Sequence, residues 1–153
     1  MNKSCRNLVL IVCGILSAAP VFAQSTRCPV AQADAAEAAV DHLDSWPAVR
    51  SAFKAFRGCD EGSIAEGFSA GVVRLLATQF QTLPTLAGLI TEEPALKVFV
   101  LRHIDTTVNP HDLQKIRQSA RKNCPANTAE LCKQLSANAT QALKKMARPA
   151  RRS

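Results

Sequence analysis

The chain has 153 residues, with 19 Lys and Arg against 12 Asp and Glu, which gives a formal net charge of +7 at pH 7. Five of the basic residues lie in the last ten positions, and residues 24–143 carry twelve charges of each sign. No basic stripe with interleaved aromatic residues runs through the body of the chain, which argues against a nucleic-acid-binding protein. The length suits one compact domain that buries its own core.

The first 23 residues have the pattern of a secretory signal peptide. Lys3 and Arg6 provide a positive start, residues 8–19 are mostly apolar, and residues 21–23 (VFA) precede the expected cleavage point. The apolar stretch is shorter than the roughly 20 residues of a transmembrane helix. We predict cleavage after Ala23 and export to the periplasm or the exterior. The alternative is a buried N-terminal helix.

Four cysteines follow the predicted signal peptide: Cys28, Cys59, Cys124 and Cys132. An even number in an oxidising compartment indicates disulfides, and four cysteines allow three connectivities. We favour Cys124–Cys132 across a turn, and Cys28–Cys59 between the N-terminal segment and a helix end. Zinc is the alternative, but the chain lacks the closely spaced Cys-x-x-Cys pairs that zinc sites favour.

Helix signals dominate the first half of the domain. The chain contains no Tyr and no Asn-Gly or Asp-Gly hairpin turn, so strand signals are scarce. The Ala-rich segment 33–43 predicts a first helix. Ser45 as a cap and Pro47 in the first turn predict a second helix, which ends at Gly58.

A third helix is expected from a Ser63–Glu66 capping box to about residue 81. A short helix over 82–90 follows. Residues 94–104 are strongly apolar and predict a helix in the core, with a strand over 98–101 as the alternative.

Two helices complete the predicted domain. Asn109 followed by Pro110 indicates a cap and the first position of one helix, and another is expected over 128–147. The pattern predicts an all-α, single-domain bundle of six or seven short helices. The helical domain occupies 24–143 and a basic C-terminal tail occupies 144–153.

The sequence GFSAG at 67–71 matches the Gly-x-Ser-x-Gly pattern of serine hydrolases. That pattern needs an apolar strand directly before it, whereas the preceding residues indicate a helix start. Asp105 and His111 would supply the nominal acid and base, but they lie only six residues apart. We therefore interpret the small residues as a helix-packing surface. We expect Ser69 to bond a carbonyl one turn back, so Ser69→Ala would be nearly silent.

A second candidate site is RHIDTTVNPHD, which contains His103, Asp105, His111 and Asp112. Metal-binding helices usually space their ligands three or four residues apart, and only two imidazoles are present here. We expect His103 to be bonded to a carbonyl at the edge of the core, and Asp112 to interact with the helix dipole. No catalytic, cofactor or metal residues are predicted.

Residues 99–118, FVLRHIDTTVNPHDLQKIRQ, resemble immunity proteins that neutralise amidase effectors of type VI secretion. In that family an apolar helix ends near an Asp, and a short turn leads to a helix with an acid–Leu start. Here these features correspond to Ile104-Asp105 and Asp112-Leu113. The family's cysteine in the first of these helices is absent, so no functional residues are carried over. The resemblance implies a helical, disulfide-containing periplasmic protein.

An interaction role is the expected function. The first hypothesis is an exported inhibitor or immunity-type protein that binds an envelope or cell-wall-degrading enzyme. The second is an envelope-associated accessory protein whose basic tail contacts anionic lipid or lipopolysaccharide. The candidate contacts in that tail are Lys144, Lys145, Arg148, Arg151 and Arg152. An enzyme is the third and least favoured hypothesis.

Overall fold

The computed structural model describes residues 28–148, and the predicted signal peptide lies outside this range. Over these residues the chain forms seven α-helices and two short 3₁₀ helices. They are α1 (Val30–Val40), α2 (Trp46–Phe56), η1 (Arg57–Cys59), α3 (Gly62–Thr78), η2 (Phe80–Thr82), α4 (Leu83–Glu92), α5 (Pro94–Arg102), α6 (Pro110–Lys122) and α7 (Ala129–Met146). The predicted all-α fold is confirmed. The alternative of a strand at 98–101 is wrong, because these residues lie in α5.

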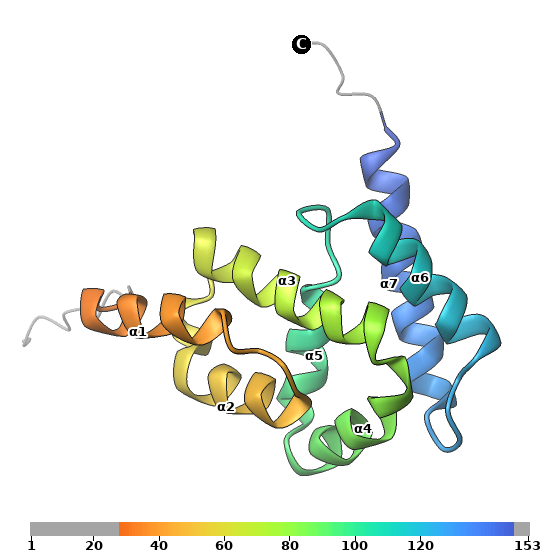
Figure 1. The fold of residues 1–153 in the computed structure, drawn as a ribbon, viewed down its shortest axis with the longest axis horizontal. Coiled ribbons are helices and arrows are strands. Elements are labelled where there is room, and N and C mark those ends of the chain that lie inside the picture. Colours follow the sequence, from red (N-terminus) through yellow and green to blue (C-terminus); the bar gives the residue numbers. More distant parts are fainter. Residues whose placement is uncertain (1–27, 149–153) are drawn as a thin grey trace, which may run out of the picture.

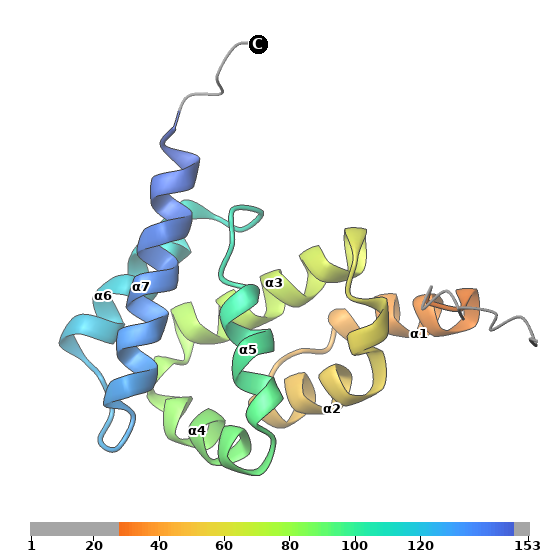
Figure 2. The same ribbon diagram turned by 180° about the vertical axis from the view of Figure 1, so that it is seen from behind.

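Helix α3 crosses the middle of the molecule (Figure 1). Helices α1 and α2 lie at one end of the molecule and the α6–α7 hairpin lies at the other end, as the reverse view in Figure 2 also shows. One hydrophobic core joins the helices, with Phe68, Leu86 and Leu113 among its fully buried side chains. Within residues 28–148 no helix is both long and apolar enough to cross a bilayer.

Two of the predicted helix caps are confirmed. Ser45 Oγ accepts a hydrogen bond from the backbone N–H of Ala48 at 3.4 Å, at the start of α2. Asn109 Oδ1 accepts from the N–H of His111 at 2.9 Å, at the start of α6. Each bond satisfies a backbone donor that has no partner within its own helix. The sequence positions of both caps therefore set where these helices begin.

The predicted capping box of α3 is wrong. The helix begins at Gly62, so Ser63 already lies inside its first turn, and the N-cap residue is Glu61, whose side chain makes no capping bond. Ser63 Oγ instead donates to Glu37 at 3.1 Å and ties the start of α3 to α1. The N-cap residue therefore lies two positions before the expected one, and Gly62 has φ +55°, a conformation that favours glycine.

Both favoured disulfides are present. Cys28–Cys59 links the segment before α1 to η1, and Cys124–Cys132 closes the turn between α6 and α7. Their Cα atoms lie 4.8 and 6.1 Å apart. Each bridge therefore stabilises the fold by restricting the unfolded chain. Two disulfides fit an oxidising compartment.

The small residues of α3 form a packing surface, as predicted. A Cβ added at Gly67 would lie 2.6 Å from a methyl group of Val40, and one at Gly71 would lie 2.7 Å from Leu43 Cβ. Leu43 lies in the turn after α1, not in the first helix as expected, and is 1% exposed. The absence of side chains at the two glycines therefore lets α1 and its following turn approach α3 closely.

Candidate functional site

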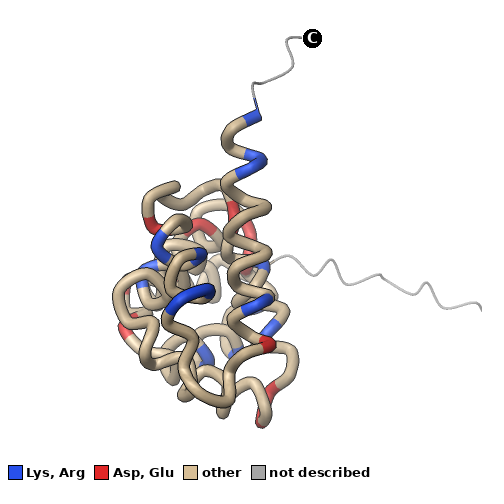
Figure 3. The backbone as a smooth tube through the Cα atoms, turned by 90° about the vertical axis from the view of Figure 1, so that its right-hand side faces the viewer, with Lys and Arg blue, Asp and Glu red and all other residues tan. Residues whose placement is uncertain are grey.

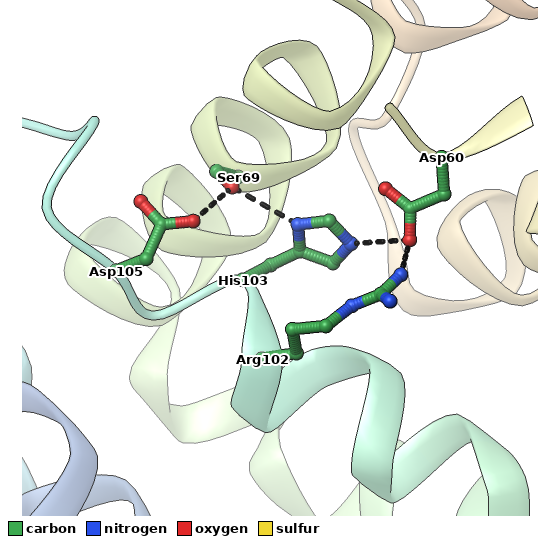
Figure 4. Close-up of polar contacts among 5 residues, drawn as sticks. All are labelled: Asp60, Ser69, Arg102, His103 and Asp105. Atoms are coloured by element: carbon green, nitrogen blue, oxygen red, sulfur yellow. Dashed lines mark hydrogen bonds and ion pairs between the residues drawn. The ribbon is translucent and has the colours of Figure 1, made fainter. Parts of the chain in front are cut away.

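Ser69, the serine of the GFSAG sequence, lies in the middle of α3 and is 1% exposed. Helical backbone continues on both sides, so the strand-to-helix turn of a serine hydrolase is not formed here. The expected bond to a carbonyl one turn back is wrong. Ser69 Oγ lies 2.9 Å from His103 Nδ1 and donates to Asp105 Oδ2 at 2.8 Å (Figure 4).

The imidazole of His103 connects α3 to Asp60, the residue directly after η1. Its Nε2 atom lies 3.2 Å from Oδ2 of Asp60, so the expected bond to a backbone carbonyl is also wrong. Asp60 has a side chain only 3% exposed, and the same Oδ2 forms an ion pair with Arg102. We call Asp60, Ser69, Arg102, His103 and Asp105 the polar cluster (Figure 4). It joins Asp60 and Ser69 to residues 102–105, and His103 lies 43 and 34 positions from these two residues.

Local structure holds the imidazole and the neighbouring carboxylate in place. The His103 ring packs edge-on against Phe99, with ring centroids 4.3 Å apart, and also contacts Phe68. Asp105 Oδ1 accepts from both the backbone N–H and the hydroxyl of Thr107, at 2.8 and 2.6 Å. An Asp that bonds the backbone two residues ahead fixes a turn. The loop between α5 and α6 therefore presents Oδ2 of Asp105 to Ser69.

Burial and hydrogen bonding shift the pKa values of two groups in the cluster, His103 and Asp105. Burial lowers the pKa of His103 to about 4, with help from the positive charge of Arg102 and against the attraction of Asp105. Burial alone would raise the pKa of Asp105. Hydrogen bonds from Thr107 and Ser69, together with His103, outweigh burial and hold this pKa below its ordinary value. At neutral pH the cluster therefore contains an uncharged imidazole and a charged Asp105.

Proton supply limits the hydrogen bonds in the cluster. The carboxylate of Asp60 only accepts, so the single N–H of the neutral imidazole is on Nε2 and Nδ1 is an acceptor. Ser69 then has one hydroxyl hydrogen and two acceptors, His103 Nδ1 and Asp105 Oδ2. A protonated imidazole would donate to both Ser69 and Asp60, and Ser69 would donate to Asp105, so that all three contacts would be hydrogen bonds. Burial opposes the positive charge of that imidazole.

We expect the stability of the protein to fall as the pH drops from about 6.5 to about 4. The unfolded chain takes up a proton at His103 near pH 6.5, and the folded chain does so only near its own pKa of about 4. Stability is therefore full above pH 6.5, and up to about 3 kcal/mol is lost across this window. Urea unfolding of the native chain and of His103→Gln, measured at several pH values, tests this. A pKa at or above 6.5 by NMR titration would contradict it and would show that the two carboxylates outweigh burial.

The cluster changes our expectation for Ser69→Ala. Removing the hydroxyl leaves His103 Nδ1 and Asp105 Oδ2 without their shared partner, so we expect a loss of about 1–3 kcal/mol instead of a silent substitution. Ser51→Ala, at an exposed position in α2, is the control and should change stability little. Chemical denaturation of both variants provides the comparison. Equal changes in the two proteins would show that the cluster does not stabilise the fold.

The structure brings together some of the residues singled out in the sequence. Ser69, His103 and Asp105 meet, whereas His111 and Asp112 lie apart from them in the first turn of α6, where Asp112 pairs with Lys115. Sequence reasoning missed Asp60, which lies 43 positions from His103, and the role of Arg102, whose partner is Asp60. Within residues 28–148 no group of three or more His, Cys, Asp or Glu side chains is placed to hold a metal ion.

A different feature lies on the surface between α2 and α5. This hollow, which we call the α2–α5 groove, has a volume of about 370 Å³ and is lined by Phe53, Arg57, Ala95, Val98, Phe99 and Arg102. Val98 is 66% exposed, and the guanidinium of Arg57 lies 5.6 Å from the centroid of the Phe53 ring. Neither α2 nor α5 contains an acidic residue. The groove is therefore apolar with two arginines among its lining residues.

The structure describes three of the five basic residues that were assigned to the tail, and two of these lie in a helix. Lys144 and Lys145 lie in the last turn of α7, and Arg148 follows the end of that helix. Arg151 and Arg152 lie outside the described residues.

Comparison of the chain with known protein families, curated proteins and solved structures found no match.

Proposed function

We propose that this protein is an exported interaction protein, of the inhibitor or immunity type, that binds an envelope or cell-wall-degrading enzyme. The α2–α5 groove is the proposed contact surface. Protein interfaces concentrate their binding energy in a few side chains that are enriched in Trp, Tyr and Arg and fill well-packed pockets. In the groove, Arg57 lies over the Phe53 ring and Val98 is 66% exposed, while Phe53 and Phe99 are only 5% and 4% exposed.

The basic residues around the groove indicate the charge of the protein segment that binds there. The lining includes Arg57 and Arg102, of which Arg102 also pairs with the buried Asp60, and Lys54 and Lys97 lie on the same two helices, which contain no carboxylate. The complementary ligand is a protein segment with an apolar side chain flanked by Asp or Glu. Positive and negative patches that match in this way speed association and select the partner. We therefore assign the groove to an acidic protein segment.

The polar cluster is the strongest competing site. Its order of contacts, from serine to imidazole to the Asp60 carboxylate, is that of a catalytic triad. Two features argue against catalysis. Ser69 is 1% exposed within a continuous helix, and its hydroxyl is also bonded to Asp105, which competes with His103 for the proton. These features support a structural junction that holds α5 in position beside the groove.

The compartment supports the same proposal. Two disulfides fit an oxidising environment, and the N-terminal sequence is typical of a signal peptide, so we place the protein in the periplasm or outside the cell. The resemblance of residues 99–118 to type VI amidase immunity proteins suggests a peptidoglycan hydrolase as the partner. These residues begin in α5, one wall of the groove.

Photo-cross-linking from single positions in the source cells tests this proposal. A benzophenone amino acid would replace Val98 in one strain and Val30 in another. Val30 is the matched control, because it is an exposed valine at 78% that lies on α1, outside the groove. We expect one envelope protein to be captured from position 98 only, and the purified chain to inhibit that protein's hydrolytic activity. Equal capture from both positions, or a captured enzyme that is not inhibited, would contradict the proposal.

A further inference from the structure

Charge is unevenly divided between the two parts of the described chain. Residues 110–148, which form the α6–α7 hairpin and the residue positions directly after it, contain eight Lys or Arg and two acids. Residues 28–109 contain six basic and ten acidic residues. Figure 3 looks onto α6 and α7 and shows Lys and Arg positions on both helices. The balanced total over residues 24–143 therefore conceals a positive hairpin.

Some of these basic residues line a hollow between the two helices. It has a volume of about 460 Å³ and is lined by Arg121 of α6 and by Lys133, Ser136, Thr140, Gln141 and Lys144 of α7. Lys133, Ser136, Thr140 and Lys144 recur at intervals of three and four, so they lie on one face of that helix. We call this feature the hairpin hollow.

The polar groups of the hollow are arranged to donate hydrogen bonds. Arg121 Nε donates to Ser136 Oγ at 3.2 Å, which holds the guanidinium against α7. Ser136 uses a lone pair for this bond and keeps its own hydroxyl hydrogen available. Thr140 Oγ1 donates its one hydrogen to the Ser136 carbonyl at 2.7 Å, so this hydroxyl adds no free donor to the hollow. The remaining guanidinium hydrogens and two ammonium groups make the hollow rich in donors.

No described carboxylate neutralises the three cations of the hollow. None of the described ion pairs involves Arg121, Lys133 or Lys144. The two acids of the hairpin have other partners, since Asp112 pairs with Lys115 and Glu130 accepts from Gln134. Three uncompensated cations at a concave surface are complementary to an oxyanion with several acceptor atoms, such as phosphate.

We propose that the hairpin hollow binds a phosphate group. The two sources of this chemistry are the headgroup of an anionic envelope lipid and free inorganic phosphate. Arg148 follows the end of α7, beyond the hollow, and the sequence continues with Arg151 and Arg152. This extension favours a lipid surface over a small free ion. The inference is independent of the α2–α5 groove.

The test compares two variants with the same loss of charge. The hollow variant is Arg121→Gln/Lys133→Gln/Lys144→Gln. The control variant, Arg117→Gln/Lys122→Gln/Lys145→Gln, also removes one Arg and two Lys from the hairpin but touches none of the hollow's lining residues. Circular dichroism and thermal unfolding first establish that both variants of the full mature chain are folded. If only the total positive charge of the hairpin determined binding, both variants would lose the same affinity.

Binding is measured to vesicles of phosphatidylglycerol and phosphatidylcholine by co-sedimentation, and to inorganic phosphate by calorimetry. We expect the hollow variant to bind at least about tenfold more weakly to the phosphate source, and the control variant less than about threefold. Loss of binding to phosphatidylglycerol vesicles identifies lipid, and loss of binding to inorganic phosphate alone identifies the free ion. Equal losses in the two variants, or no binding to either source, would overturn the proposal.

Discussion

Gly71→Leu should destabilise the protein by about 3 kcal/mol or prevent it from folding. A Cβ at this position would lie 2.7 Å from both Cβ and Cδ1 of Leu43, and Leu43 is itself 1% exposed. Because Leu43 Cβ is fixed by the backbone, rotation of the side chain cannot relieve the contact. Overpacking of this kind costs about 1–3 kcal/mol even for small additions. Gly71→Ala, the milder substitution, remains measurable by urea denaturation if the Leu variant does not fold.

Gly88→Ala is the matched control for Gly71→Ala. It also lies within a helix, α4, but a Cβ there would meet no atom within 4 Å. The higher helix propensity of Ala should stabilise this variant by up to about 1 kcal/mol. The two substitutions therefore have opposite expected signs. Stabilisation of the protein by Gly71→Ala would show that α1 and its following turn do not pack closely on α3.

Arg102→Ala should lower the free energy of unfolding by about 3 kcal/mol. The Asp60 side chain is 3% exposed, and it would keep only the neutral His103 as a partner. Leaving a buried carboxylate without its counter-charge costs about 3–5 kcal/mol. We expect the lower end of that range, because the Arg102 side chain is 60% exposed and water can partly replace it.

A double-mutant comparison separates the buried charge from lost packing. Asp60→Asn in the Arg102→Ala background should recover part of the stability, since a neutral amide needs no cation. Arg50→Ala removes an arginine from the more exposed pair with Glu92, whose side chain is 61% exposed, and should cost at most about 1 kcal/mol. Similar losses for Arg50→Ala and Arg102→Ala, with no recovery by Asp60→Asn, would contradict a stabilising role for the Asp60 ion pair.

Most features that could be predicted from sequence depend on neighbouring residues, and the Cys28–Cys59 disulfide, which spans 31 positions, is the exception. The caps at Ser45 and Asn109 act within one turn of their helices, so their local patterns identify both helix starts. Cys124 and Cys132 are separated by eight positions, and the turn between them brings them together. Helical periodicity and the Ala-rich first segment gave six or seven helices in the observed order for a similar reason, because periodicity reflects which face of a helix is buried.

The polar cluster could not be predicted because its contacts join distant residues. Asp60 and His103 are 43 positions apart, and Ser69 and His103 are 34 apart. A single sequence contains no signal that pairs them. The hairpin hollow could not be predicted from the sequence for another reason. The basic residues were assigned to a tail by counting along the chain, whereas folding places Lys144 in the same hollow as Arg121 and Lys133.

The most direct measurement is the affinity of the purified chain for the partner captured through Val98. We predict that Val98→Asp weakens binding about tenfold or more, which corresponds to roughly 1.4 kcal/mol, because it places a carboxylate where an acidic partner segment docks. Val30→Asp and a folded Ser69→Ala variant should bind like the native chain. Unchanged binding by Val98→Asp, or loss of binding in Ser69→Ala with the groove intact, would contradict the account.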